Sequence, residues 1–166
     1  MYISYDEYAA LYSGDSIESV FNRLAFDACR YLDRFTTGAD GVKKLKVAFP
    51  TDEDSVAAVK NCAAKVINQL YQIQEAEKSA SMGRGYISTE NGLQGKVIAS
   101  VTSGEESITY STSAKTGSTT AIDAAVSDIR YRENMLREIV WDYLGGVPDA
   151  NGVNLLYMGV YPRRYQ

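Results

Sequence analysis

The sequence predicts a mainly α protein: a helical bundle of three long helices plus a short N-terminal helix, with one inserted antiparallel β-hairpin and an extended C-terminal tail. Two observations predict this fold class. Apolar residues recur every three or four positions over much of the 166-residue chain, as on the buried face of a helix. In the middle of the chain the period changes to two, which is typical of strands. We expect one domain over residues 1–166, with the hairpin insertion at about 85–116 and the tail at about 147–166.

The first predicted helix is short and rich in tyrosine. Ser4 and Glu7 have the spacing of a capping box, and Tyr5, Tyr8 and Tyr12 share one helix face. Packing of these rings onto a neighbouring helix is the simplest interpretation. The same rings could form a surface for a partner, so all three tyrosines are also candidate interface residues.

Three long amphipathic helices are expected near residues 16–36, 52–77 and 121–144. Each carries a continuous apolar stripe and is therefore predicted to contribute to a shared core. Trp141 lies off the centre of the last stripe. Its ring is either a lid over the core or a contact between subunits, and the sequence leaves both open.

The middle long helix is predicted to begin with three acids. Thr51 is the expected cap, and Asp52, Glu53 and Asp54 complement the positive end of the helix dipole. Adjacent helix residues diverge by about 100 degrees, so these carboxylates do not predict a metal site.

The inserted hairpin is predicted near residues 96–111. Val97, Ala99 and Val101 alternate with polar residues, and a polar link containing Gly104 leads to a second alternating run that starts at Ile108. The flanks are rich in serine, threonine and glycine and show no phosphate-loop spacing.

The C-terminal tail contains Gly159 and Pro162, which argue against a helix. Considered as a strand, the tail is apolar on both faces and needs cover on both sides. Pairing with the hairpin of its own chain and strand addition to a partner both remain open. We expect the tail to swing free of the bundle, so that truncation after Gly152 leaves the domain folded. The tail residues expected at a partner interface are Leu155, Leu156, Tyr157, Val160 and Tyr161.

Composition excludes several kinds of catalytic site. The chain has no histidine, so a Ser-His or Cys-His pair and a His-rich zinc site cannot be built. Cys29 and Cys62 fall on apolar helix faces and are predicted to be small buried hydrophobes. We expect no catalytic residue, no cofactor and no metal.

The charge balance bears on partners and location. A net charge of −4 argues against binding that neutralises many phosphates. Lys43, Lys44 and Lys46 form the one basic cluster and lie in a predicted loop, where solvated charge is the usual explanation. Apolar runs fall far short of the roughly 20 residues that cross a bilayer, so we expect the chain to stay in the cytoplasm where it is made.

The whole order of elements resembles the head-tail connector (adaptor, head-completion) proteins of long-tailed, double-stranded-DNA bacteriophages. The residues that carry the resemblance are the stretches 1–8 and 21–26, Ser100 and Gly104 around the hairpin turn, and the stretches 108–111 and 155–160. The resemblance covers essentially the full chain. It implies a non-enzymatic structural protein of the virion, located at the head-tail junction.

The resemblance further implies a ring of about twelve subunits beneath the portal protein that docks a tail or head-completion protein. DNA passes through such a ring without sequence-specific binding. Candidate surfaces for ring closure are the N-terminal tyrosines, Trp141 and the hairpin. The alternative function is a helical regulatory or small-molecule-binding module, because helix bundles also host ligands in their cores.

Overall fold

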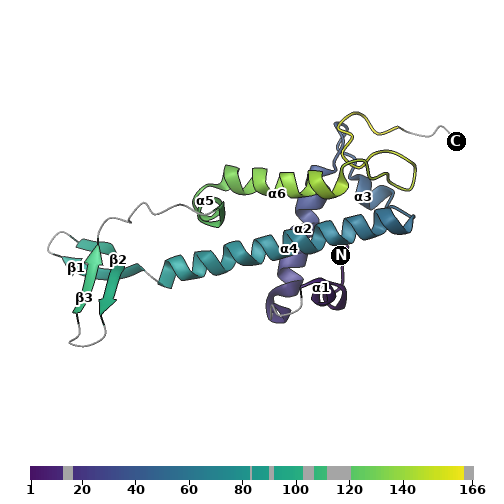
Figure 1. The fold of residues 1–166 in the computed structure, drawn as a ribbon. Coiled ribbons are helices and arrows are strands. Elements are labelled where there is room, and N and C mark those ends of the chain that lie inside the picture. Colours follow the sequence, from purple (N-terminus) through teal and green to yellow (C-terminus); the bar gives the residue numbers. More distant parts are fainter. Residues whose placement is uncertain (13–16, 83, 90–91, 103–106, 112–120, 163–166) are drawn as a thin grey trace. The chain divides into compact units, whose positions relative to one another are not determined.

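The computed structural model describes residues 1–12, 17–82, 84–89, 92–102, 107–111 and 121–162, with the backbone alone described within 79–111. The chain divides into two compact units: unit 1, Met1–Tyr71 and Arg130–Gln166, and unit 2, Gln72–Ile129. The class is mainly α, as predicted. The described residues form α1 (Tyr5–Leu11), α2 (Glu18–Phe35), α3 (Lys44–Val47), α4 (Glu53–Met82), α5 (Ala121–Ser127) and α6 (Ile129–Leu144), with strands β1 (Arg84–Thr89), β2 (Gly92–Thr102) and β3 (Ser107–Ser111) (Figure 1).

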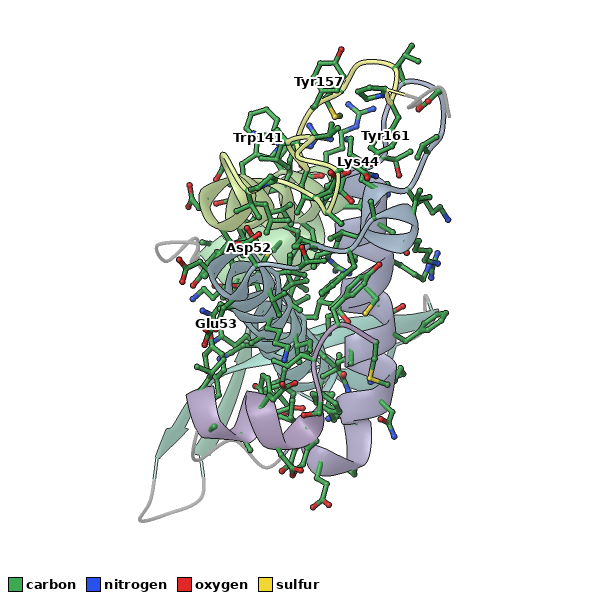
Figure 2. All side chains as sticks on the ribbon, turned by 90° about the vertical axis from the view of Figure 1, so that its right-hand side faces the viewer. Lys44, Asp52, Glu53, Trp141, Tyr157 and Tyr161 are labelled. Atoms are coloured by element: carbon green, nitrogen blue, oxygen red, sulfur yellow. The ribbon has the colours of Figure 1, made fainter. Side chains whose placement is uncertain are left out.

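Unit 1 is built around one hydrophobic core to which all its helices contribute. Within it, α6 lies beside α4 and α2 crosses them (Figures 1 and 2). The apolar stripes predicted from the sequence are the faces that meet here. Core residues with no more than 4% exposure include Tyr8, Phe21, Leu24, Leu32, Leu45, Val59, Val66, Ile67, Leu136, Val140, Leu144 and Leu155.

The long helices match the prediction in part. The first two correspond to α2 and α4, although α4 continues to Met82. Asp52 rather than Thr51 caps α4, since its Oδ2 accepts from the backbone N–H of Ser55 at 2.8 Å. Hydrogen bonds from the Ser55 side chain and from its backbone N–H lower the pKa of the Asp52 carboxyl.

The prediction of one helix over residues 121–144 is wrong, because the chain leaves the helical state at Asp128 and restarts at Ile129. Next to this break, the hydroxyl of Ser127 donates to the backbone carbonyl of Asp123 at 2.8 Å. Serine and aspartate side chains compete for backbone groups in this way and are favoured at helix ends.

The N-terminal tyrosines pack onto α2, as the simpler of the two interpretations predicted. The Tyr5 and Tyr8 rings lie 5.3 and 5.7 Å from the Phe21 ring, and Tyr12 stacks on Tyr8 at 5.2 Å. Tyr8 is fully buried. Its role as an interface residue is therefore a wrong prediction, because a partner could reach it only if α1 came away from the core.

The predicted capping box of α1 is confirmed and is extended by an ion pair. Glu7 accepts from the backbone N–H of Ser4 at 2.8 Å and pairs with Lys60 of α4 at 2.5 Å. The hydrogen bond from Lys60, and those from Ser4, lower the pKa of the Glu7 carboxyl to about 2. The partly exposed carboxylate therefore ties α1 to α4 through a charge that persists in mild acid.

We expect Glu7→Gln to lower the urea midpoint at neutral pH, and expect this difference to shrink as the pH falls from about 4.5 toward 2. The depressed folded-state pKa of Glu7 stabilises the fold above the unfolded pKa and loses that effect as the folded state takes up the proton. Urea titrations at several pH values measure the difference. Lys60→Met should reproduce the pH dependence, and a difference that grows toward pH 2 would contradict the assignment.

Unit 2 contains an antiparallel sheet of strand order β1-β2-β3. The segment predicted as a hairpin falls on β2 and β3, which pair from Val97 opposite Ser111 to Thr102 opposite Ser107. The register shifts between Ile98 and Ser100, so the simple alternation of the sequence is interrupted by an irregularity. Strand β1, paired with β2, was not predicted, and the hairpin link 103–106 lies outside the described residues.

The two cysteines are free thiols. Cys62 is fully buried, as predicted, and burial raises the pKa of its thiol to about 12. Cys29 is half-buried, and partial burial also raises the pKa of its thiol. In the described part of the chain no helix combines the length and the apolar character of a membrane span.

Candidate functional site

The C-terminal tail is a folded part of unit 1. The backbone N–H of Ala39 donates to the carbonyls of Met158 and Gly159 at 3.1 and 3.2 Å. A Cβ on Gly38 would lie 2.9 Å from the carbonyl oxygen of Gly159, so this close approach of two backbones requires glycine. The prediction of a free tail is wrong, and so is its interpretation as a strand: its described residues make one isolated bridge, between Pro148 and Asn154.

A buried lysine holds the tail to the end of α2. Lys44 has no exposed surface, and its Nζ donates to the carbonyls of Thr36 and Leu155 at 3.0 Å each and to the carbonyl of Tyr157. Burial lowers the pKa of the ammonium, and the charges of Asp149 and Asp40 oppose that shift. The ammonium thus donates both to a carbonyl at the C-terminal end of α2 and to two carbonyls of the tail.

Two aspartates fix the rest of the tail. The Oδ1 atom of Asp149 accepts from the backbone N–H groups of Asn151 and Val153 at 2.8 and 2.9 Å, and its Oδ2 accepts from the hydroxyl of Tyr161. The backbone N–H of Tyr161 donates to Asp40 at 3.1 Å. The tail is therefore closed onto unit 1 at both ends of its apolar stretch.

These contacts separate the predicted interface residues of the tail into two groups. Leu155 and Tyr161 are 0% and 7% exposed, so their assignment to a partner interface is wrong. Leu156 is half-buried against the core. Tyr157 and Val160 are 49% and 66% exposed and remain available to a partner. The sequence pattern could not separate the two groups, because both consist of apolar residues at alternating positions.

Trp141 is exposed, which removes the lid interpretation. Its side chain is 55% accessible and lines a small pocket of about 310 Å³, and Figure 2 shows its ring at the edge of unit 1. Met158 of the tail, 58% exposed, was not predicted as part of this surface. The pocket, called the Trp141 pocket below, is lined by Arg34, Phe35, Arg137, Trp141 and Met158.

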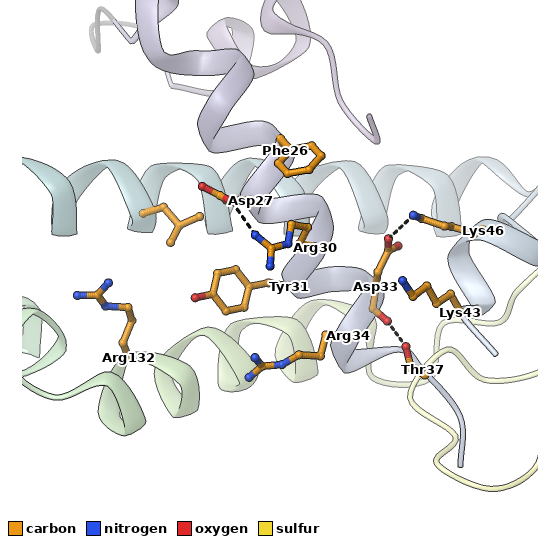
Figure 3. A pocket seen from close by; sticks show the side chains of 11 residues that line it. Phe26, Asp27, Arg30, Tyr31, Asp33, Arg34, Thr37, Lys43, Lys46 and Arg132 are labelled. Atoms are coloured by element: carbon orange, nitrogen blue, oxygen red, sulfur yellow. Dashed lines mark hydrogen bonds and ion pairs between the residues drawn. The ribbon is translucent and has the colours of Figure 1, made fainter. Parts of the chain in front are cut away.

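A second and larger hollow, of about 890 Å³, lies along α2 and is called the basic cleft below (Figure 3). Its side chains come from α2, the α3 region, α4 and α6. Five are basic and two are acidic, although the chain as a whole has a net charge of −4. The lining residues are Phe26, Asp27, Arg30, Tyr31, Asp33, Arg34, Thr37, Lys43, Lys46, Leu70 and Arg132.

The cleft combines a buried carboxylate with exposed cationic side chains. Asp33 is 5% exposed, accepts from the hydroxyl of Tyr2 and pairs with Lys46 at 3.1 Å. Burial and the Asp33 carboxylate raise the pKa of the Tyr2 hydroxyl. Arg34 pairs with Glu133 of α6 at 2.9 Å and lies over the Phe35 ring at 5.2 Å. The pairs orient the cationic side chains, which keep more than half of their surface accessible at Arg34 and Lys46.

Sequence reasoning missed the basic cleft because its charges come from separate elements. The lysine cluster was predicted to be a solvated loop, yet Lys44 is buried and starts α3, whereas Lys43 and Lys46 face the cleft. The only signal in the sequence was the spacing of Arg30 and Arg34 by one turn on the polar face of α2.

A metal site requires several ligating side chains around one ion. Within the described ranges, no group of three or more histidine, cysteine, aspartate or glutamate side chains could hold a metal ion. Comparison with known proteins finds no matching family model, curated protein or solved structure.

Proposed function

We propose that this chain is a non-enzymatic structural protein of the head-tail junction of a long-tailed, double-stranded-DNA bacteriophage. Its subunits form a ring of about twelve beneath the portal protein, and the ring joins the DNA-filled head to the tail. Its partners are the portal and a tail or head-completion protein. The chain is made in the cytoplasm of the bacterial host, from an infecting phage or a prophage, and is carried in the virion.

The Trp141 pocket is the observation that carries this proposal. Its lining combines tryptophan, methionine, phenylalanine and two arginines, which are the residue types enriched at protein interfaces. Trp141 and Met158 expose 55% and 58% of their surfaces, although a monomer would gain by burying them. A partner that inserts an apolar side chain beside Arg34 and Arg137 would cover both.

The charge of the chain supports the second part of the proposal, the passage of DNA. With a net charge of −4, the subunit contributes overall repulsion to a phosphate backbone. Tight phosphate binding would oppose transit, because each neutralised phosphate adds affinity. A ring of acidic subunits therefore lets the duplex move without sequence-specific contact.

We expect Trp141→Ala to weaken binding to the portal ring of the same phage by at least about 30-fold, because a central aromatic anchor contributes about 2 kcal/mol or more. Surface plasmon resonance on immobilised portal measures the affinity, and negative-stain electron microscopy shows whether a ring is added beneath the portal.

Tyr131→Ala is the matched control for this variant, since Tyr131 is an aromatic residue of the same helix with 43% exposure and does not line the pocket. It should bind portal like the wild type. Equal loss in both variants would assign the effect to α6 in general, and wild-type binding by Trp141→Ala would remove the Trp141 pocket from the portal contact.

The alternative function, a helical regulatory or small-molecule-binding module, gives a different result in the same preparation. Such a module stays monomeric or dimeric in the presence of portal, and a metabolite raises its melting temperature. A connector forms a ring-sized species with portal, and no metabolite is needed.

A further inference from the structure

We propose that the basic cleft of one subunit receives the acidic start of α4 of a second copy of this chain. The acidic start is defined as Asp52, Glu53 and Asp54. The idea that this contact closes a ring rests on the proposed function. The contact itself is inferred from the charges and positions of the two surfaces.

The basic cleft has the charge and shape to receive an acidic segment. Its lining carries five cations against two carboxylates, and Arg30 is 71% exposed, with its ion pair to Asp27 no closer than 3.6 Å. Lys43 is exposed and forms no ion pair with any described residue. Phe26, 62% exposed, adds an apolar wall to these charges. An acidic segment with some apolar character fits this lining.

The acidic start of α4 offers the complementary charge. All three residues are exposed, and the Asp52 carboxylate is engaged by the N–H of Ser55 as the helix cap. Glu53 and Asp54 make no ion pair within the described residues, so their charges face solvent. They project from a helix end, the part of unit 1 that can enter a hollow on another molecule.

The positions of the two surfaces require a second copy. Figure 2 shows Asp52 and Glu53 on the left of unit 1, and α2, which carries most of the cleft's side chains, on the right. One subunit cannot place its own acidic residues in its own cleft, because the two surfaces are fixed at different places on the same folded unit. A contact between two different faces is heterologous, and such a contact gives a ring when its rotation closes.

Nucleic acid is the other polyanion that a basic cleft could bind, but the observations favour the second copy. The cleft contains Asp27 and Asp33, and Arg34 is already paired with Glu133. These carboxylates would repel a phosphate backbone, whose binding needs many uncompensated cations. A short acidic segment needs only two cations, and Arg30 and Lys43 can supply them, since Arg30 is 71% exposed and Lys43 is exposed.

The test is sedimentation velocity of the full chain at rising protein concentration, in about 0.05 M and about 0.5 M NaCl. We expect the wild type to self-associate and its dissociation constant to rise at least about tenfold in the higher salt. Two double variants, Glu53→Lys with Asp54→Lys and Arg30→Glu with Lys43→Glu, should each weaken association by at least about tenfold. The chain that combines all four substitutions should regain association to within about threefold of the wild type.

The control must reproduce the cost of placing lysine near a helix N-terminus. Asp6→Lys with Glu18→Lys makes the same charge change in the first turns of α1 and α2, at exposed acids away from the proposed contact. It should associate like the wild type. Circular dichroism of every variant checks that it is folded. Glu53→Gln with Asp54→Asn, which removes both charges without placing lysine at the start of the helix, should weaken association to a smaller degree.

The outcomes separate this contact from the proposed function. A wild type that binds portal yet stays monomeric at every concentration overturns the contact and leaves the connector role standing. If self-association is lost in the two double variants and restored in their combination, but the wild type does not bind portal, the contact is supported and the connector role is removed. If the chain that combines all four substitutions fails to regain association, the contact is overturned. The contact is also overturned if Arg30→Glu with Lys43→Glu abolishes binding to a DNA duplex and leaves self-association unchanged.

Discussion

Replacing Lys44 with methionine is expected to lower the free energy of unfolding of unit 1 by about 3 kcal/mol. Methionine fills a similar volume, so little of this loss comes from a cavity. The loss comes from the carbonyls of Thr36, Leu155 and Tyr157, which remain in place without the donor that satisfies them. Removing the cost of burying the ammonium offsets part of the loss, but a buried acceptor without a partner is expensive.

Urea titration followed by tryptophan fluorescence measures this effect, because Trp141 is the only tryptophan and lies in unit 1. Lys43→Met is the matched control at an exposed neighbour and should change stability by no more than about 0.5 kcal/mol. Equal midpoints for the two variants would show that the Lys44 hydrogen bonds contribute nothing net.

Truncation after Gly152 is expected to unfold unit 1 or to cost more than about 4 kcal/mol, a large part of the stability of an ordinary domain. The truncation removes Leu155 from the core, the hydroxyl that bonds to Asp149, and two of the three carbonyls that hold Lys44. The sequence pattern alone predicts the opposite result, an unaffected domain, because it treats the tail as free.

Thermal unfolding followed by circular dichroism measures the effect of truncation. Ending the chain after Pro162 is the control, since every tail contact named above is retained, and its melting temperature should stay within a few degrees of the full chain. At the level of single residues, Leu155→Ala should cost about 2–5 kcal/mol and Val160→Ala less than about 0.5 kcal/mol, because Leu155 is buried and Val160 is 66% exposed. Similar losses at both positions would contradict the docked tail.

Features that depend only on neighbours within one or two helical turns could be predicted from the sequence. The mainly helical class, the capping box of Ser4 and Glu7 and the packing face of the N-terminal tyrosines follow from periods of three and four residues. The burial of Cys62 follows from the same apolar stripe. These features are local, so the residues that cause them lie side by side in the chain.

The docking of the tail and the composition of the cleft could not be predicted from the sequence, because both depend on contacts between distant segments. The sequence predicts Lys44 to be a solvated loop residue. In the structure its ammonium donates to the carbonyls of Leu155 and Tyr157, which lie 111 and 113 positions away in the chain. The basic cleft likewise gathers cations from α2, the α3 region and α6 that share no sequence pattern. Hydrophobicity is an intrinsic property of a residue, whereas the partner that satisfies a charge or covers an apolar face depends on which segments the fold brings together.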